Sequence, residues 1–192
     1  IGLVTGLTAS QQWEAFLMWR NAQNFGTSDP QFGMDLGFFV FTLPWLSMLV
    51  GFLTMAVVLA AAAAAFMHYV YGGLQLADRG RGTTRFALLH LSTLFAVIVL
   101  LRAASYWLDR YALTLQTSDL MTGIQYTDAN AVLPTKAILA VASIMCAAMF
   151  LSVIWTRSWR LPVVGTVLLV VTSIVVGGIF PALIQSLKVR PS

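Results

Sequence analysis

The sequence predicts an all-α integral membrane protein with several membrane-spanning helices. Of its 192 residues, 59% are hydrophobic and only 9% are charged, whereas soluble domains are about 25% charged. Residues 36–77 contain no Asp, Glu, Lys or Arg. A soluble domain needs ionic groups on its surface to stay dispersed, and a disordered chain has far fewer apolar side chains. Both of those classes are therefore excluded.

Four apolar runs are each long enough to cross a bilayer as a helix, which takes about 20 residues. We predict spans at residues 44–71, 86–107, 135–156 and 162–183. Their apolar residues run on without the alternation that membrane β-strands show, so a barrel is excluded. The predicted fold class is a polytopic helical bundle.

Residues 1–9 are apolar but too few to span a bilayer. The chain begins at Ile1, without a Met or a basic segment. We interpret residues 1–9 as the end of a fifth span, and residues 1–192 as a single transmembrane domain of a longer protein.

The first full span carries start and stop signals. Thr42 is expected to cap it, with Pro44 in the first helical turn, and Gly72-Gly73 is expected to end it. Residues 35–41 are predicted to form a separate short interfacial segment.

Basic residues in short loops predict how the chain is threaded, because cytoplasmic loops are enriched in Lys and Arg. Residues 72–85 and 157–160 carry a net charge of +4, the same as the whole chain, and the remaining loops and ends sum to zero. We therefore predict that these two loops are cytoplasmic and that both chain ends are extracytoplasmic. The arginines that determine this topology, and that are placed to touch lipid headgroups, are Arg79, Arg81, Arg85, Arg157 and Arg160.

Acidic residues in the predicted outer loops are weak candidates for a metal site. Oxygen ligands gathered from two loops are what Ca²⁺ prefers, and the candidates are Asp29, Asp35, Asp128 and Asn130. The sequence lacks an EF-hand loop. Turn initiation by Asp29-Pro30 and helix capping by Asp35 and Asp128 explain these residues better, so no metal is predicted.

Arg102 is the one charged residue well inside a predicted span. Residues 102, 106 and 109 share one helix face, with Arg110 next to them. We predict an intramembrane ion pair between Arg102 and Asp109. A substrate or ion pathway is the alternative, since ionisable groups inside a membrane often mark one.

Two histidines are expected at similar depth in neighbouring spans. His68 lies near the end of the first full span, and His90 lies near the start of the next. Facing imidazoles are able to bind haem or a metal, but no third ligand is evident. Interfacial histidines hydrogen-bonded to the backbone or to lipid headgroups are the favoured interpretation, and no cofactor is predicted.

Three segments carry a recognisable pattern: residues 25–44 (FGTSDPQFGMDLGFFVFTLP), 106–111 (YWLDRY) and 123–134 (GIQYTDANAVLP). In this order they resemble a bacterial membrane family called uncharacterised protein family 0182. The resemblance implies a longer protein of about seven N-terminal spans followed by a large extracytoplasmic region, with this chain covering the end of the third span through the seventh. It also implies location in the bacterial inner membrane.

No phosphate-binding, nucleophile-elbow or zinc-protease motif is present, and no acidic residue lies inside a span. The predicted function is therefore a non-enzymatic membrane protein that anchors an extracytoplasmic region or scaffolds an envelope complex. The alternatives are a transporter or channel using Arg102 and the outer-loop acids, and an enzyme whose active site lies elsewhere in the longer protein. The expected partners are the lipid bilayer and other spans or membrane subunits, with no nucleic acid.

Overall fold

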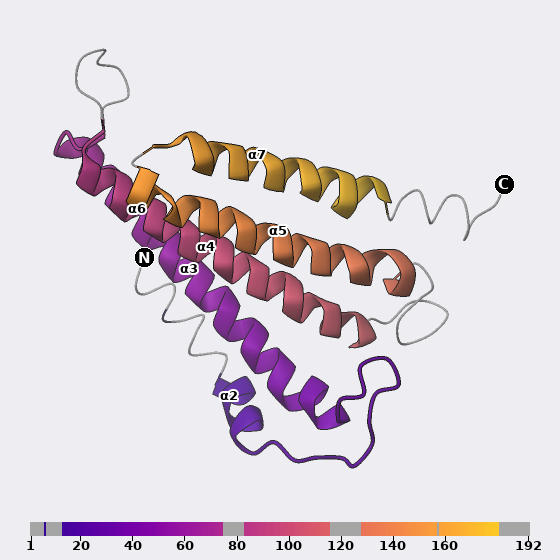
Figure 1. Cartoon of the computed structure of the whole chain (residues 1–192). Coiled ribbons are helices and arrows are strands. Elements are labelled where there is room, and N and C mark those ends of the chain that lie inside the picture. The colour runs from indigo at the N-terminus through magenta and orange to yellow at the C-terminus, as the bar shows by residue number, and fades with distance from the viewer. Residues whose placement is uncertain (1–5, 7–12, 75–82, 116–127, 157, 181–192) are drawn as a thin grey trace.

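The computed structural model describes residues 6, 13–74, 83–115, 128–156 and 158–180 (Figure 1). Within this part of the chain, four helices are long and apolar enough to cross a membrane. They cover Phe38–Val70, Arg85–Leu115, Asp128–Thr156 and Arg160–Ile179. The predicted all-α membrane fold with four full spans is confirmed.

Each span is built mainly from one α-helix. The α-helices are α2 (Trp13–Arg20), α3 (Leu43–Val70), α4 (Arg85–Ala112), α5 (Leu133–Leu151), α6 (Val153–Thr156) and α7 (Arg160–Ile174). A 3₁₀ turn (Leu113–Leu115) extends α4, and π-helical turns lie at Phe38–Thr42, Asp128–Val132 and Val175–Ile179. The predicted span end at residues 1–9 and the last residues of the fourth span lie outside the described residues, apart from Gly6.

The four long helices lie side by side in a row, each antiparallel to its neighbour in the chain (Figure 1). Contacts join α3 to α4, α4 to α5, and α5 to α7. We call the end where α3 ends and α4 begins the arginine end, after Arg85 and Arg160. The opposite end, where Asp35, Asp109 and Asp128 lie, is the acidic end.

The core of the row lies between α4 and α5. Ala96, Cys146 and Phe150 are buried together, and the ring of Phe95 stacks on that of Phe150 with centroids 5.8 Å apart. The edge helices bury little: α3 buries Leu43 and Ala61, and α7 buries Pro162 and Gly165. Most of the apolar surface of α3 and α7 is therefore not covered by the described residues.

Two spans begin with the same device, a π-helical turn followed by Leu-Pro. Phe38–Thr42 precedes Leu43-Pro44, and Asp128–Val132 precedes Leu133-Pro134. Proline has no N–H to donate and crowds the preceding turn, so it interrupts the hydrogen bonds of an α-helix. A wider π-turn before the proline accommodates this interruption. The predicted separate segment at residues 35–41 is wrong, because residues 36–42 continue directly into α3. The predicted cap is also wrong, since the Thr42 side chain makes no capping hydrogen bond.

The connection between α3 and α4 is fixed at the arginine end by backbone hydrogen bonds. The helix ends beside Gly72, whose φ of 71° suits glycine, as the Gly-Gly pair predicted. The Gly73 N–H donates to the His68 carbonyl at 2.7 Å, and the Thr84 N–H donates to the Gly73 carbonyl at 2.9 Å. The Thr84 side chain accepts the Ala87 N–H at 3.4 Å and caps α4.

Gly165 allows α7 to approach α5 closely. A Cβ at this position would lie 2.8 Å from Met149 Sδ and 3.2 Å from Met149 Cβ, and Gly165 is buried. By contrast, a Cβ on Gly51 of α3 would meet nothing within 4 Å. Small residues at such contacts are a general means of packing helices in lipid.

We expect Gly165→Leu to lower the free energy of unfolding by about 1–3 kcal/mol, because the added side chain overpacks the contact between α5 and α7. Thermal unfolding in detergent micelles measures this. Gly51→Leu is the matched control: it has the same gain in helix propensity without the crowding, so it should leave stability unchanged or raise it by up to about 1 kcal/mol. Equal effects at the two positions would show that the close approach at Gly165 does not matter.

Candidate functional site

The loop before α3 is folded around the carboxylate of Asp35. Asp35 Oδ1 accepts the N–H of Phe25 at 3.0 Å and that of Gly37 at 2.7 Å, and Oδ2 accepts the N–H of Gly26 at 2.9 Å. These bonds, with Phe25 first, then Gly37 and Gly26, lower the pKa of Asp35 below its ordinary value of 3.8. The carboxylate thus ties the start of the loop to the start of the first span.

The same loop turns back on itself at Asp29 and meets the end of α4. The buried Asp29 carboxylate accepts the N–H groups of Gln31 at 3.1 Å and Phe32 at 3.3 Å, and Ser28 forms an antiparallel bridge with Asp35. The turn places the Phe32 ring edge-on to Tyr111, with centroids 4.9 Å apart. The rings of Phe38 and Phe39 also lie against Tyr111.

Asp29 and Asp35 thus serve local structure, and Asp29 initiates a turn as predicted. Asp35 and Asp29 direct their carboxylates at backbone N–H groups, whereas Asp128 and Asn130 lie in the π-turn before α5. In the described part of the chain, no three His, Cys, Asp or Glu residues lie close enough together to hold a metal ion.

The charged groups at the end of α4 pair differently from the prediction. Lys136 Nζ of α5 lies 2.7 Å from Asp109 Oδ2 and forms a salt bridge. Arg102 instead lies over the ring of Tyr106, 4.9 Å from its centroid, and donates to its hydroxyl at 3.4 Å. The predicted pair between Arg102 and Asp109 is therefore corrected. Two helical turns separate those residues, whereas Lys136 faces Asp109 across the contact between α4 and α5.

Lys136 is the residue that sequence reasoning missed. It begins a span that runs antiparallel to α4, so it reaches the depth at which α4 ends. Because α4 and α5 are antiparallel neighbours, as α3 and α4 are, Lys136 lies opposite Asp109 just as His90 lies opposite His68. Its ammonium lies 5.5 Å from the Tyr106 ring centroid as well.

A polar cavity of about 370 Å³ lies beside this salt bridge, between α4, α5 and the π-turn that ends the fourth span. Thr135 Oγ1 donates to the Val176 carbonyl at 3.0 Å and joins the last two elements. Lys136 is already paired with Asp109 and the Thr135 hydroxyl with Val176, so these polar groups hold the helices together beside the cavity. Its lining residues are Tyr106, Val132, Thr135, Lys136, Leu139, Ser173, Gly177 and Gly178.

At the arginine end, His68 and His90 lie at similar depth, as predicted, and their rings bond to each other rather than to the backbone or to lipid headgroups. His68 Nε2 lies 3.1 Å from His90 Nδ1, and the two rings are nearly perpendicular at 84°. Arg85 and Arg160 begin α4 and α7 at this same end. Arg79, Arg81 and Arg157 lie outside the described residues.

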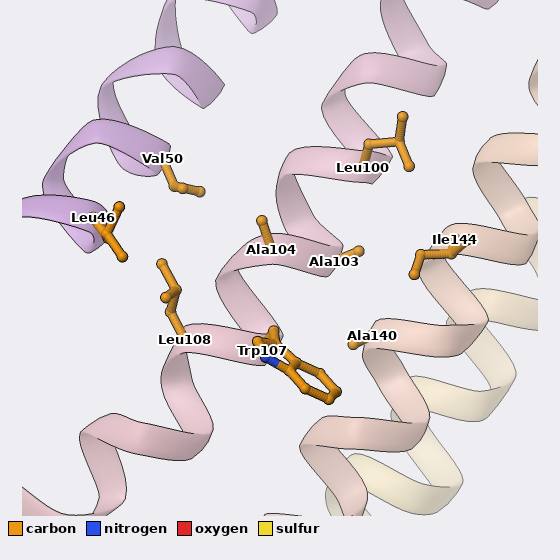
Figure 2. A pocket seen from close by; sticks show the side chains of 9 residues that line it. All are labelled: Leu46, Val50, Leu100, Ala103, Ala104, Trp107, Leu108, Ala140 and Ile144. Atoms are coloured by element: carbon orange, nitrogen blue, oxygen red, sulfur yellow. The ribbon is translucent and has the colours of Figure 1, made fainter. Parts of the chain in front are cut away.

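An apolar groove of about 440 Å³ crosses α3, α4 and α5 (Figure 2). Small side chains from α4 and α5 lie along it, and Trp107 borders it with 46% of its surface exposed. The lining residues are Leu46, Val50, Leu100, Ala103, Ala104, Trp107, Leu108, Ala140 and Ile144. The groove offers no polar side chain apart from the indole of Trp107, so it suits hydrocarbon or another apolar helix.

The three segments singled out in the sequence converge at the acidic end. Phe32 and Phe38 of the first contact Tyr111 of the second, and Tyr106 shares the polar cavity with Val132 of the third. Four apolar spans joined by such structured ends define a polytopic α-helical membrane protein.

Comparison with known proteins gives the family. The model of the uncharacterised protein family UPF0182 matches residues 1–192, and the chain belongs to this family. It is 52% identical to a UPF0182 protein of Kineococcus radiotolerans and 46% identical to one of Streptomyces coelicolor, in both cases over the whole chain. The chain spans about a fifth of the length of these curated relatives, 19% and 20% respectively. No solved structure matches it.

We expect the hydrogen bonds of Asp35 to persist as the pH falls past 3.8 and to be lost only below that value. Because the pKa of Asp35 is lower in the native than in the unfolded state, its carboxylate stabilises the loop at pH values above the unfolded pKa. This stabilisation is lost as the pH falls through the native pKa. Hydrogen exchange at the amides of Phe25 and Gly26, compared with the Asp35→Ala variant, measures it. Glu14→Gln is the control. Amide protection that is equal in the wild type and Asp35→Ala would contradict this role.

A double-mutant cycle of Lys136→Met with Asp109→Asn should give a coupling energy of about 0.2–1 kcal/mol, the range of partly exposed ion pairs. Unfolding in mixed micelles measures it. The cycle of Arg102→Gln with Asp109→Asn is the control, and it should give a coupling near zero. A larger coupling for Arg102 than for Lys136 would restore the pair predicted from the sequence.

Proposed function

We propose that this chain is a non-enzymatic membrane scaffold, whose row of helices anchors an extracytoplasmic region and packs against further spans of the same longer protein or other membrane subunits. The observation that carries the proposal is the arrangement of the helices. They lie in a single row, and the edge helices leave their apolar faces largely uncovered. Such a row offers far more lateral contact surface than a closed bundle does.

The groove across α3, α4 and α5 is the best-defined part of that surface (Figure 2). The side chains of Ala103, Ala104 and Ala140 are small and leave room in the groove. Small residues let a further helix approach closely. The chain spans about a fifth of its curated relatives. Additional membrane segments of such a longer protein are the occupants that we propose for this groove.

We propose the bacterial inner membrane as its location, with the arginine end cytoplasmic and the acidic end extracytoplasmic. The charge bias supports this, because the short loops 72–85 and 157–160 carry five arginines and one acid, whereas the rest of the chain carries six basic and six acidic residues. The loops 72–85 and 157–160 would then be cytoplasmic and both chain ends extracytoplasmic.

The transporter alternative has less support. Arg102 lies exposed on α4 against Tyr106, and the Asp29 and Asp35 carboxylates are occupied by backbone N–H groups. These residues come from separate places and do not line one passage. Their positions favour structural roles at the ends of the spans.

We expect Ala104→Trp to weaken assembly of the full-length protein by filling the groove, while the chain still inserts into the membrane. Native gels and size-exclusion chromatography of the detergent-solubilised protein would report lost partners or a loosened fold. Cysteine cross-linking from Leu46 should also identify the segment that occupies the groove.

Ala22→Trp is the control. Ala22 is an exposed alanine outside the four spans and does not line the groove, so the same increase in size should leave assembly unchanged. Normal assembly of Ala104→Trp, together with cross-linking of Leu46 to lipid alone, would overturn the proposed scaffold role of the groove.

A further inference from the structure

The two histidines at the arginine end form a preorganised pair. His68 lies in the last turns of α3 and His90 in the second turn of α4, and their facing nitrogens, Nε2 and Nδ1, are 3.1 Å apart. Phe86 lies against both rings, with centroids 5.9 Å from His68 and 6.0 Å from His90. His90 is exposed and His68 is half-buried, so the described residues do not enclose the pair.

The backbone holds the two rings in place. The hydrogen bonds from Gly73 to His68 and from Thr84 to Gly73 connect the end of α3 to the start of α4. A Cβ on Gly73 would lie 3.2 Å from His68 Nδ1, so a larger residue there would crowd the ring. The facing nitrogens are thus set by the helical hairpin itself.

The separation of the nitrogens matches that of two ligands on one metal ion. Metal–nitrogen bonds of about 2.0–2.1 Å, at angles between a right angle and a tetrahedral one, place two donor atoms about 2.8–3.4 Å apart. Imidazole suits Cu²⁺, Ni²⁺ and Zn²⁺ rather than the hard cations Ca²⁺ and Mg²⁺. Because the nitrogens face each other in a hydrogen bond, each ring must turn by about 40° for both lone pairs to point at one ion bound at this distance.

We propose that His68 and His90 together bind a divalent transition-metal ion, of the Cu²⁺ or Zn²⁺ class, at the arginine end. Water fills the remaining coordination positions, and the ion exchanges readily because the pair supplies only two protein ligands. From the neutral pair, no proton is released: the hydrogen that lies between the rings moves to the outer nitrogen of the ring that carried it. The bound ion would link the end of α3 to the start of α4.

Titration of the full-length protein in nanodiscs with Cu²⁺, followed by electron paramagnetic resonance, tests the site. We expect one bound Cu²⁺ that shows coupling to two nitrogens and that is absent from the double variant His68→Gln, His90→Gln. Each single variant should lower the affinity for Cu²⁺ at least about tenfold. Even the loss of a residue that only orients a metal ligand lowers metal affinity by that factor. Phe86→Leu is the control and should retain the ion.

A second measurement uses the wild-type protein, so that a variant that does not fold leaves the proposal testable. Zn²⁺ should protect both histidines from diethyl pyrocarbonate, read by mass spectrometry. The proposal is overturned if Zn²⁺ leaves their modification unchanged. It is also overturned if removing only one of the two histidines affects Cu²⁺ binding, because that would indicate a single surface ligand.

Discussion

Hydrocarbon offers no hydrogen-bond partners, so each peptide group of the spans must find one within the protein. This constraint explains the helices themselves and the way in which they begin. Pro44 and Pro134 each lack an N–H, and each follows a π-turn that carries the helix past the break. The π-turn ending the fourth span uses a side chain instead, since Thr135 donates to the Val176 carbonyl. Beyond the spans, Asp35 accepts the N–H groups of Phe25 and Gly26 in the preceding loop and that of Gly37 at the start of the helix.

Lateral contacts between the helices follow a different rule. Because lipid is as apolar as a leucine side chain, burial drives helices together weakly, and close packing and polar contacts do more. In this chain, Gly165 provides the close approach between α5 and α7. The polar contacts lie near the two ends of the row: His68 meets His90 at one end, and Lys136 meets Asp109 at the other. The middle of the row is held by small and aromatic apolar side chains such as Ala96 and Phe150.

The sequence predicted what depends on composition and helix order. Uncharged runs gave the four spans, and antiparallel order placed His68 opposite His90. The partner of Asp109 was predicted wrongly because Arg102 shares its helix face, which the sequence shows. Lys136 lies on a neighbouring helix and comes close to Asp109 only in the folded chain. The π-turns were missed because proline usually marks a helix start, and whether the chain is already helical before it depends on tertiary contacts such as those of Phe39 with Tyr111.

The first two spans are longer than a bilayer requires. At 1.5 Å per residue, the 33 helical residues of Phe38–Val70 extend about 50 Å, whereas the hydrocarbon layer is about 30 Å thick. The helix must therefore tilt strongly or stand out past the hydrocarbon. Arg85–Leu115, with 31 residues, is nearly as long, so this side of the row would deform the surrounding bilayer and favour neighbours of matching height.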